Sequence, residues 1–400
     1  MNRILIKNGY VWFQNKFVKQ DILIVNTKIT RLAKRINDEK AKIIDANGLH
    51  VLPGLVDVHV HLREPGYEYK ETIKTGTMSA AAGGYTTICC MPNTKPIIDN
   101  LSTLNNLKKL IKQKAIVNIL PYASITKQEK GQALVNIPSL AKHCFAFSDD
   151  GVGIASSDLM FKAMQQCKKV NKVIVAHCED ISQKNSNAKE SKEVERNLKL
   201  ASKTKCQLHI CHVSTHESIN LIKKAKAQKV NVSCEVTPHH LLLNKNNVIN
   251  QGTYKMNPPL ANPKDQQVLK KALADGTIDM IVTDHAPHAD KEKNTTYEKS
   301  LNGIVGLETA FSLIYTHFVK TKAISFSRMI NLMSLNPCKI FKIKSHQIIL
   351  NNTANITIMD LNTKWAINNN EFKSKGKSTP FNHHNVFSKA KYTIVNGQIV

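Results

Sequence analysis

Apolar and polar residues alternate near both ends of the chain, which is the pattern of half-buried strands. At the start, ILIK and YVWF flank Asn8-Gly9, a dipeptide favoured in two-residue hairpin turns, and the strand-like segments DILIV and KITRLAK follow. At the far end, ANITIMDL is followed by KYTIV, Asn396-Gly397 and QIV. We predict a hairpin at each Asn-Gly pair, and one small β-sheet domain built by both chain ends, at about 1–52 and 345–400.

Between these ends, short apolar runs alternate with helix-like stretches such as 157–170 and 216–228. Most runs are spaced by roughly 30 residues, the size of one βα repeat. Eight runs start at Leu55, Tyr85, Val117, His143, Val173, Gln207, Val230 and Met280. Eight βα units predict an α/β fold, a (β/α)₈ TIM-type barrel over 53–344, more than a doubly wound sheet. The long interval before the eighth run predicts a long loop.

Composition places this chain among reduced, globular proteins. Hydrophobic residues make up 42% of it, which is enough for a core. The sequence has no run of about 18 apolar residues, so we predict no membrane span. The first residues read as a strand and not as a signal peptide. The nine cysteines lack both a CxxC pair and a disulfide framework. We therefore expect buried, reduced thiols and a cytoplasmic location.

The formal net charge is +26, which raises the question of a nucleic-acid or membrane partner. The lysines are scattered over helix-like segments, and the sequence has no recognition helix, RNA-binding signature or basic tail. We expect solvated lysine faces and neither nucleic acid nor membrane as a partner. An anionic substrate would gain mildly from the positive field.

Polar residues stand where several of the eight runs end. They are His59 and His61 in the first run, Asp149 and Asp150 after the fourth, His177 after the fifth, His212 after the sixth and Asp284 after the eighth. In a (β/α)₈ barrel, the carboxyl ends of the strands converge on one face, where active sites lie. Residues far apart in sequence should therefore become neighbours.

His59 and His61 are two residues apart on a strand, so their side chains point to the same side. An isolated HxH is more often a pair of hydrogen-bonded histidines, but the other polar strand ends favour a zinc site here. Four histidines and two carboxylates exceed one tetrahedral site and fit two metals that share a bridge. Such a pair can polarise an amide carbonyl and generate hydroxide near neutral pH.

Two further residues of these runs are predicted to support the site. His209 should face away from His212 and be structural. Asp57 should share the face of His59 deeper in the barrel, where it would be a support more than a ligand.

Several motifs carry a family resemblance. The chain resembles the type I dihydroorotases from about residue 50 to its end, in GLVDVHVHLREPG (54–66), GGYTTICCMPNTKP (83–96), FAFSDDGVG (145–153), AHCED (176–180), HICHVST (209–215), EVTPHHLLL (235–243), YKMNPPL (254–260), TDHAPH (283–288), GIVGLETAF (303–311) and SKGKSTPF (374–381). The order of these motifs agrees with the barrel spacing, which makes the resemblance specific.

The resemblance implies two zinc ions and a role for each polar strand end. His59, His61 and Asp284 would bind one zinc, His177 and His212 the other, and Asp150, preferred to Asp149, would bridge them. Asp284 would also act as general base and then general acid. The implied reaction is the reversible cyclisation of N-carbamoyl-L-aspartate to dihydroorotate in de novo pyrimidine synthesis.

The resemblance also implies substrate contacts from His61, Arg63, Asn93, Asn257, His288, Asn302 and Gly303. Arg63 and Asn93 would hold the substrate carboxylate, and guanidinium chemistry suits that role because it can bind a carboxylate bidentately. A homo-oligomer and an aspartate carbamoyltransferase partner are further implications.

The sequence departs from the family pattern in three places. The segment 178–211 is short, and we expect it to be a loop near the active face. Ala261 stands where the family usually has arginine, and Asn302 where it usually has phenylalanine.

Two alternative functions would require other residues. A dihydropyrimidinase or allantoinase would usually bridge its metals with a carboxylated lysine, whereas the fourth strand end here offers Asp149 and Asp150 and no lysine. A non-catalytic scaffold for aspartate carbamoyltransferase would be expected to lose metal ligands, whereas this chain keeps all of the expected ones.

Overall fold

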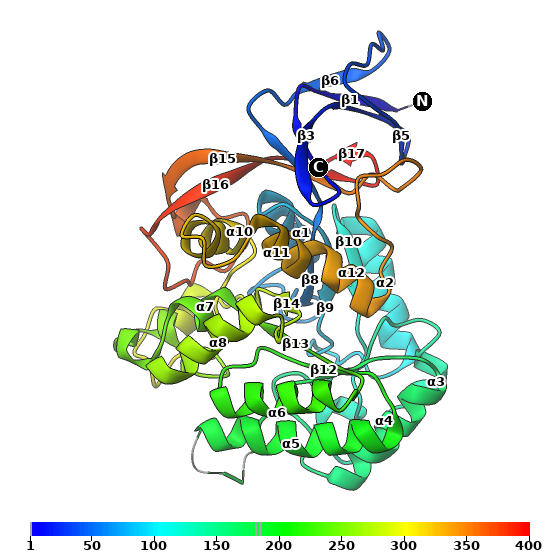
Figure 1. Cartoon of the computed structure of the whole chain (residues 1–400). Coiled ribbons are helices and arrows are strands. Elements are labelled where there is room, and N and C mark those ends of the chain that lie inside the picture. Colours follow the sequence, from blue (N-terminus) through cyan, green and yellow to red (C-terminus); the bar gives the residue numbers. More distant parts are fainter. Residues whose placement is uncertain (1, 181, 184–185) are drawn as a thin grey trace.

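The computed structural model describes residues 2–180, 182–183 and 186–400, as a barrel covered by helices with sheets at one end (Figure 1). Two sets of parallel strands form the barrel wall. One sheet has the order β10-β9-β8 and the other the order β11-β12-β13-β14. Their bounds are β8 Leu55–Val60, β9 Tyr85–Cys90, β10 Asn118–Pro121, β11 Ile174–Ala176, β12 Leu208–Ile210, β13 Val232–Val236 and β14 Met280–Ile281.

Single parallel bridges join the two sheets into a closed ring. Phe147 pairs with Ala123 after β10 and with Ile174 in β11, and Val60 of β8 pairs with His285 after β14. In the described part of the chain, the ring thus contains the eight predicted runs, the fourth of which contributes only the Phe147 bridges. The predicted (β/α)₈ barrel is confirmed.

Helices follow most of the strands and cover the barrel. They are α1 Ile73–Ala82, α2 Leu101–Lys114, α3 Ile137–Leu140, α4 Ser157–Lys169, α5 Ser186–Thr204, α6 His216–Ala227, α7 Pro238–Leu242 and α8 Pro263–Asp275, then α9 Asp290–Lys293, α10 Ala310–Ile314, α11 Phe326–Ile330 and α12 Asn336–Phe341. In α4, Met160, Ala163, Met164 and Cys167 are buried, which is the spacing of one helix face. The side chain of Ser156 caps this helix by accepting from Leu159 N.

The two predicted loops have different outcomes. Most of 178–211 is α5, which is 19 residues long, although residues 181 and 184–185 lie outside the described residues. The interval before β14 contains α7 and α8 and, between them, the predicted long loop at 243–262, with only two short 3₁₀ turns. The loop prediction for 178–211 is therefore wrong: a mostly polar stretch was not recognised as the helix of a βα unit.

Strands from the two chain ends build the sheets beside the barrel. A four-stranded sheet has the order β5-β4-β1-β6, and a six-stranded sheet has the order β17-β16-β15-β7-β2-β3. The first uses β1 Arg3–Lys7, β4 Asp21–Val25, β5 Lys28–Ala33 and β6 Lys42–Asp45; the second uses β2 Tyr10–Phe13, β3 Lys16–Lys19, β7 His50–Pro53, β15 Ile356–Ala366, β16 Asn385–Val395 and β17 Gln398–Ile399. One apolar cluster contains residues of both ends, including Ile4, Ile24, Ile356 and Ile394. The division into 1–52 with 345–400 and 53–344 stays a prediction.

The two Asn-Gly pairs behave differently. At Asn396-Gly397, β16 and β17 pair antiparallel across the turn, as predicted, and both turn residues have positive φ. At Asn8-Gly9, β1 pairs with β4 and β6, and β2 pairs with β3 and β7, so the predicted hairpin is wrong. Both edges of β1 are occupied, so the turn leads into another sheet. A Cβ on Gly9 would lie 2.7 Å from Val51 Cγ2.

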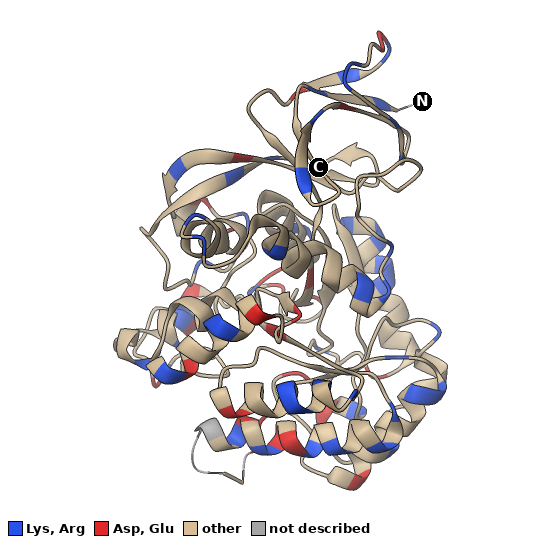
Figure 2. Cartoon of the chain, viewed as in Figure 1, with Lys and Arg blue, Asp and Glu red and all other residues tan. Residues whose placement is uncertain are grey.

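Charge and cysteine placement agree with the composition. Figure 2 shows lysine and arginine spread along the outer helices and not gathered in one patch. The nine cysteines are free and buried in the described structure. None of the helices of the described residues is long and apolar enough to cross a membrane.

Candidate metal centre

Four histidines and two aspartates meet at the carboxyl ends of the barrel strands. His59 and His61, at 0% and 5% exposure, project to the same side of β8, with ring centroids 5.4 Å apart. His177 follows β11 and His212 follows β12, and their rings meet edge to face, with Nδ1 of His177 3.0 Å from Nε2 of His212. The structure thus brings together the histidines that the strand ends predicted.

Asp150 lies between the two histidine pairs. Its Oδ1 is 3.4 Å from His59 Nε2, and its Oδ2 is 3.3 Å from His61 Nε2. The same Oδ1 lies 3.8 Å from His177 Nδ1 and 3.9 Å from His212 Nε2. Two sets of ligand atoms each lie within 4.8 Å of one another: those of His59, His61 and Asp150, and those of Asp150, His177 and His212. Asp150 belongs to both sets, which is the geometry of a bridging ligand.

The neighbouring Asp149 points elsewhere. Its carboxylate accepts from the backbone N–H groups of Ile125 and Thr126 and from the Thr126 hydroxyl. Asp284 lies on the side of the first pair, with Oδ1 3.1 Å from His61 Nε2 and 3.4 Å from His59 Nε2. Asp150 and Asp284 are therefore the two aspartates that face the histidines.

Three buried atoms in this cluster have no hydrogen-bond partner among the described residues. They are Nδ1 of His212 and, 3.4 Å apart, Nε2 of His59 and Oδ1 of Asp150. Buried polar atoms are nearly always hydrogen-bonded, so these atoms need another partner. A cation between His59 and Asp150 would satisfy the last two, and imidazole nitrogen with carboxylate oxygen is a donor set that divalent zinc accepts. The cluster can therefore hold a metal.

The pKa shifts show how strongly the charges of this cluster interact. Burial alone would lower the pKa of His59, but the carboxylates of Asp150, Glu235 and Asp284 together raise it well above its ordinary value. Burial alone would raise the pKa of Asp150, but His59, His61 and His177 hold it well below its ordinary value. Burial, together with His177 and His59, lowers the pKa of His212 to about 3. Asp150 is thus ionised and His212 neutral, as metal ligands must be, whereas His59 would have to release a proton when a metal binds.

Glu235 on β13 is a supporting residue that the sequence reasoning missed. This fully buried carboxylate accepts from His59 Nδ1 at 2.6 Å and from His209 Nε2 at 2.9 Å. It thereby fixes the hydrogen of His59 on Nδ1 and leaves Nε2 free to face the cluster. A glutamate within the apolar run VSCEV was the available signal, because buried glutamates are rare unless paired.

The two predicted supports are in place. His209 also contacts Ser233 Oγ at 2.8 Å, so it is held away from the cluster. Asp57 accepts from the backbone N–H of His59 and of Thr283, both at 2.9 Å, and so ties β8 to the end of β14. Asp57 acts on the backbone of His59 and not on its ring.

Arg63 and His288 form a basic wall beside the first histidine pair. Arg63 Nε donates to Pro287 O at 3.0 Å, and its Nη2 lies 3.4 Å from His288 Nε2. The carbonyl of Asn302 accepts from His288 Nε2 at 2.7 Å. Gly303 follows with φ 132, and a Cβ there would lie 2.6 Å from Ala286 O, so glycine is needed. The residue at position 302 makes this contact through its backbone carbonyl, so the contact does not require a particular side chain there.

The two predicted asparagines lie against the histidines. Asn93 Oδ1 is 3.0 Å from His61 Nδ1, and its Nδ2 donates to Asp150 O at 3.3 Å. Asn257 Nδ2 donates to Glu179 Oε2 at 2.8 Å and lies 3.4 Å from His177 Nε2. Asn93 therefore orients the first histidine pair, and Asn257 lies beside the second.

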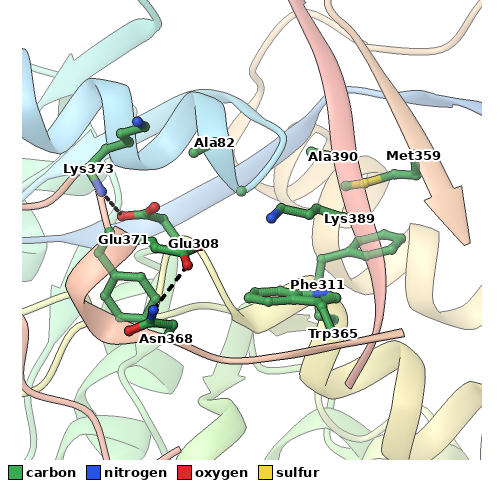
Figure 3. A pocket seen from close by; sticks show the side chains of 13 residues that line it. Ala82, Glu308, Phe311, Met359, Trp365, Asn368, Glu371, Lys373, Lys389 and Ala390 are labelled. Atoms are coloured by element: carbon green, nitrogen blue, oxygen red, sulfur yellow. Dashed lines mark hydrogen bonds between the residues drawn. The ribbon is translucent and has the colours of Figure 1, made fainter. Parts of the chain in front are cut away.

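A cavity of about 180 Å³ opens at the second histidine pair, lined by His177, Glu179, Asn257 and Asn302 among others. A larger one of about 410 Å³ lies elsewhere, between α1, α10 and the long strands β15 and β16 (Figure 3). Its walls carry Glu308, Trp365 and Lys389, and it contains none of the clustered histidines. The smaller cavity is therefore the one next to the candidate chemistry.

The fold and this site define a cyclic-amide hydrolase class. An L-hydantoinase (dihydropyrimidinase) from Arthrobacter aurescens is similar with a TM-score of 0.90 and 26% identity, over 100% of this chain and 96% of that one. A dihydropyrimidinase from Brevibacillus agri matches with a TM-score of 0.88 and 21% identity, over 100% and 95%. The chain has the fold of these amidohydrolases.

Sequence relatives specify the family. Residues 48–200 match the family model described as Dihydro-orotase-like. A dihydroorotase from Staphylococcus aureus is 45% identical, over 99% of this chain and 98% of its own length. One from Macrococcus caseolyticus is 43% identical, over 99% and 97%. The chain belongs to the dihydroorotase family.

Proposed function

We propose that this chain is a dihydroorotase that holds two zinc ions and interconverts dihydroorotate and N-carbamoyl-L-aspartate in de novo pyrimidine synthesis. The observation that carries the proposal is Asp150, whose carboxylate belongs to two ligand groups at once, with Asp284 beside the first. His59, His61 and Asp284 would hold one ion, His177 and His212 the other, and Asp150 both. Bound zinc would polarise the amide carbonyl and acidify water.

Asp284 would transfer the proton. Its carboxylate lies at the end of the barrel beside His61 and His59, where the substrate carbonyl would sit. As water adds to the carbonyl carbon, Asp284 takes a proton, and it returns that proton to the ring nitrogen as the C–N bond breaks. In the cyclisation direction, the same steps run in reverse and release water.

The residues around Asp284 would orient the substrate. Arg63 and His288 offer N–H donors 3.4 Å apart, which suits a carboxylate oxygen. The resemblance adds Asn93 to this carboxylate site, and His61, Asn257, Asn302 and Gly303 to the substrate pocket. A substrate with a carboxylate at one end and an amide at the other would then lie across the cluster.

A hydantoinase-like activity is the competing function, since the structural neighbours carry that name. The 45% identity to dihydroorotases and an aspartate, not a lysine, at the fourth strand end favour dihydroorotase. The experiment is to load the purified chain with zinc, determine its metal content, and assay dihydroorotate, hydantoin and allantoin in parallel. Turnover of dihydroorotate with about two zinc ions per chain is expected. Faster turnover of hydantoin or allantoin, or a chain that binds no metal, contradicts the proposal.

Location and assembly are further parts of the proposal. Nine buried, unpaired thiols support a reducing, cytoplasmic location. A homo-oligomer and an aspartate carbamoyltransferase partner are proposed from the family resemblance alone, and sedimentation of the chain with and without that partner tests both.

A further inference from the structure

Lys70 is a buried lysine next to the proposed carboxylate site. It stands between β8 and α1, is only 9% exposed, and its Nζ lies 3.2 Å from His288 Nδ1 and 3.1 Å from Glu292 Oε1. The rings of Tyr67 and Tyr69 flank its ammonium group, each with its centroid 5.5 Å away. Neither the strand-end pattern nor the family motifs had indicated this residue.

The contacts of His288 define where its hydrogen is. Nε2 lies 2.7 Å from the Asn302 carbonyl, which can only accept, so Nε2 carries a hydrogen. Nδ1 faces the Lys70 ammonium, which can only donate, so Nδ1 carries none. The ring is therefore neutral, with its hydrogen on Nε2.

The charges around His288 act in the same direction. Burial first, then Arg63 and Lys70, lower the pKa of His288 to about 3, with a smaller contribution from Lys293. Glu292 is the opposing group, with Oε2 3.4 Å from His288 Nδ1. Glu292 would attract a proton to Nδ1 if the Lys70 ammonium did not already contact both Glu292 and Nδ1.

We propose that Lys70 is a positioning residue that holds His288 as the neutral Nε2–H tautomer, so that His288 and Arg63 together present N–H donors to the substrate carboxylate. The proposal rests on the proposed function for the identity of that substrate. Arg63 Nη2 and His288 Nε2 are 3.4 Å apart and both are donors, so an oxygen that accepts from Arg63 there also lies within reach of the Nε2 hydrogen. A carboxylate oxygen there would share the Nε2 hydrogen with the Asn302 carbonyl.

Removing Lys70 should change the protonation state of His288 and not merely weaken a contact. Glu292, 3.4 Å from Nδ1, would then draw a proton to that atom, while the Asn302 carbonyl keeps the hydrogen on Nε2. The ring would become an imidazolium. An imidazolium would make substrate affinity depend on pH over the range where histidine ordinarily titrates.

The test compares Lys70→Met with Lys70→Arg, which keeps a donor, and with Lys74→Met, an exposed lysine on α1. Histidine ¹⁵N spectra of the zinc-loaded proteins are recorded from about pH 5 to 9, and His288→Gln identifies the His288 signal. Wild type, Lys70→Arg and Lys74→Met should keep the neutral Nε2–H pattern throughout. Lys70→Met should show a ring that titrates within this range. Its KM should change with pH as the ring titrates, whereas the KM of Lys70→Arg should follow wild type, and kcat should stay within about twofold.

A double variant separates positioning from general damage. Lys70→Met combined with His288→Gln should have the same KM as His288→Gln alone, because Lys70 acts through His288. Multiplying losses would overturn the proposal, as would an Nδ1–H signal in wild type or a His288 ring that stays neutral throughout in Lys70→Met. The spectra need no turnover, so an inactive wild type would count against the proposed function and leave the tautomer assignment to be judged separately.

Discussion

The two sides of the candidate site are built from the same strand ends but have opposite chemistry. His61 and Asp284 face the candidate metal cluster, whereas Arg63 and His288, two and four residues further along, face the proposed carboxylate site. The first side gathers lone pairs that could hold cations. The second gathers N–H donors that could hold an anion. A substrate that carries an amide carbonyl and a carboxylate would be oriented by this difference, and variants on each side should fail in different ways.

The largest effect is expected for Asp284→Asn, on the metal side. The amide can still offer an oxygen to a metal but cannot accept a proton, so hydrolysis should fall by about 10²–10⁴-fold while at least one zinc remains. Turnover and metal content are measured on the same sample. Recovery of near wild-type turnover with added zinc would show that Asp284 is only a ligand.

Glu235→Gln should also affect the metal side, by weakening the binding of the metal. The amide cannot accept from both His59 Nδ1 and His209 Nε2, so His59 loses its orientation. Metal affinity should fall about 10–100-fold, and excess zinc should restore much of the rate. Glu195→Gln, on the exposed face of α5, is the matched control and should bind zinc normally. An unaltered zinc titration for Glu235→Gln would argue against this role.

Arg63→Lys should affect the carboxylate side alone. Lysine keeps the charge but loses the planar fork, so kcat/KM should fall about tenfold or more, mainly through KM. Zinc content should be that of wild type. If turnover at low substrate is unchanged, Arg63 is not the carboxylate clamp.

Lys293→Met tests how the buried Lys293, near the proposed carboxylate side, makes the free energy of unfolding depend on pH. Lys293 is 3% exposed and donates to the carbonyls of Lys255 and Leu301, and burial, with Lys255, lowers its pKa to about 7. Between pH 7 and the ordinary lysine pKa, Lys293 is protonated in the unfolded chain but neutral in the folded chain. The free energy of unfolding therefore rises with pH over this range. The free energy of unfolding of wild type relative to Lys293→Met should rise by up to about 1.4 kcal/mol per pH unit above pH 7. Urea unfolding measures it, with exposed Lys291→Met as control. Parallel pH curves would contradict the shifted pKa.

The smallest effect is expected for Asn302→Ala. Only the carbonyl of this residue accepts from His288, so kcat/KM should change by less than about twofold. The adjacent Gly303→Ala is the contrasting variant, because its Cβ would collide with Ala286 O. Equal losses in the two variants would mean that the Asn302 side chain has a role of its own.

Local patterns predicted much of the barrel and one side of the site. The eight apolar runs all lie in the barrel wall, and the predicted helices at 157–170 and 216–228 are α4 and α6 to within one residue. The histidines and aspartates at strand ends could be found because each follows its own apolar run and the ring brings those ends together. The shortened 178–211 segment was misjudged because the polar helix α5 has little apolar signal.

The sequence by itself determined the eight strand runs, the candidate residues at their ends and the family resemblance, because each run and motif depends on residues close together along the chain. Only the tertiary structure decided that Asn8-Gly9 leads into another sheet while Asn396-Gly397 closes a hairpin, since the edges of β1 are occupied by β4 and β6. It gave the physical reason for preferring Asp150, as the resemblance had, to Asp149: Asp150 faces the histidines, whereas Asp149 is held by Thr126. Glu235 and Lys70 likewise became visible through partners that are distant in the chain, His59 and His288, because pairing of buried charges is a property of the folded interior.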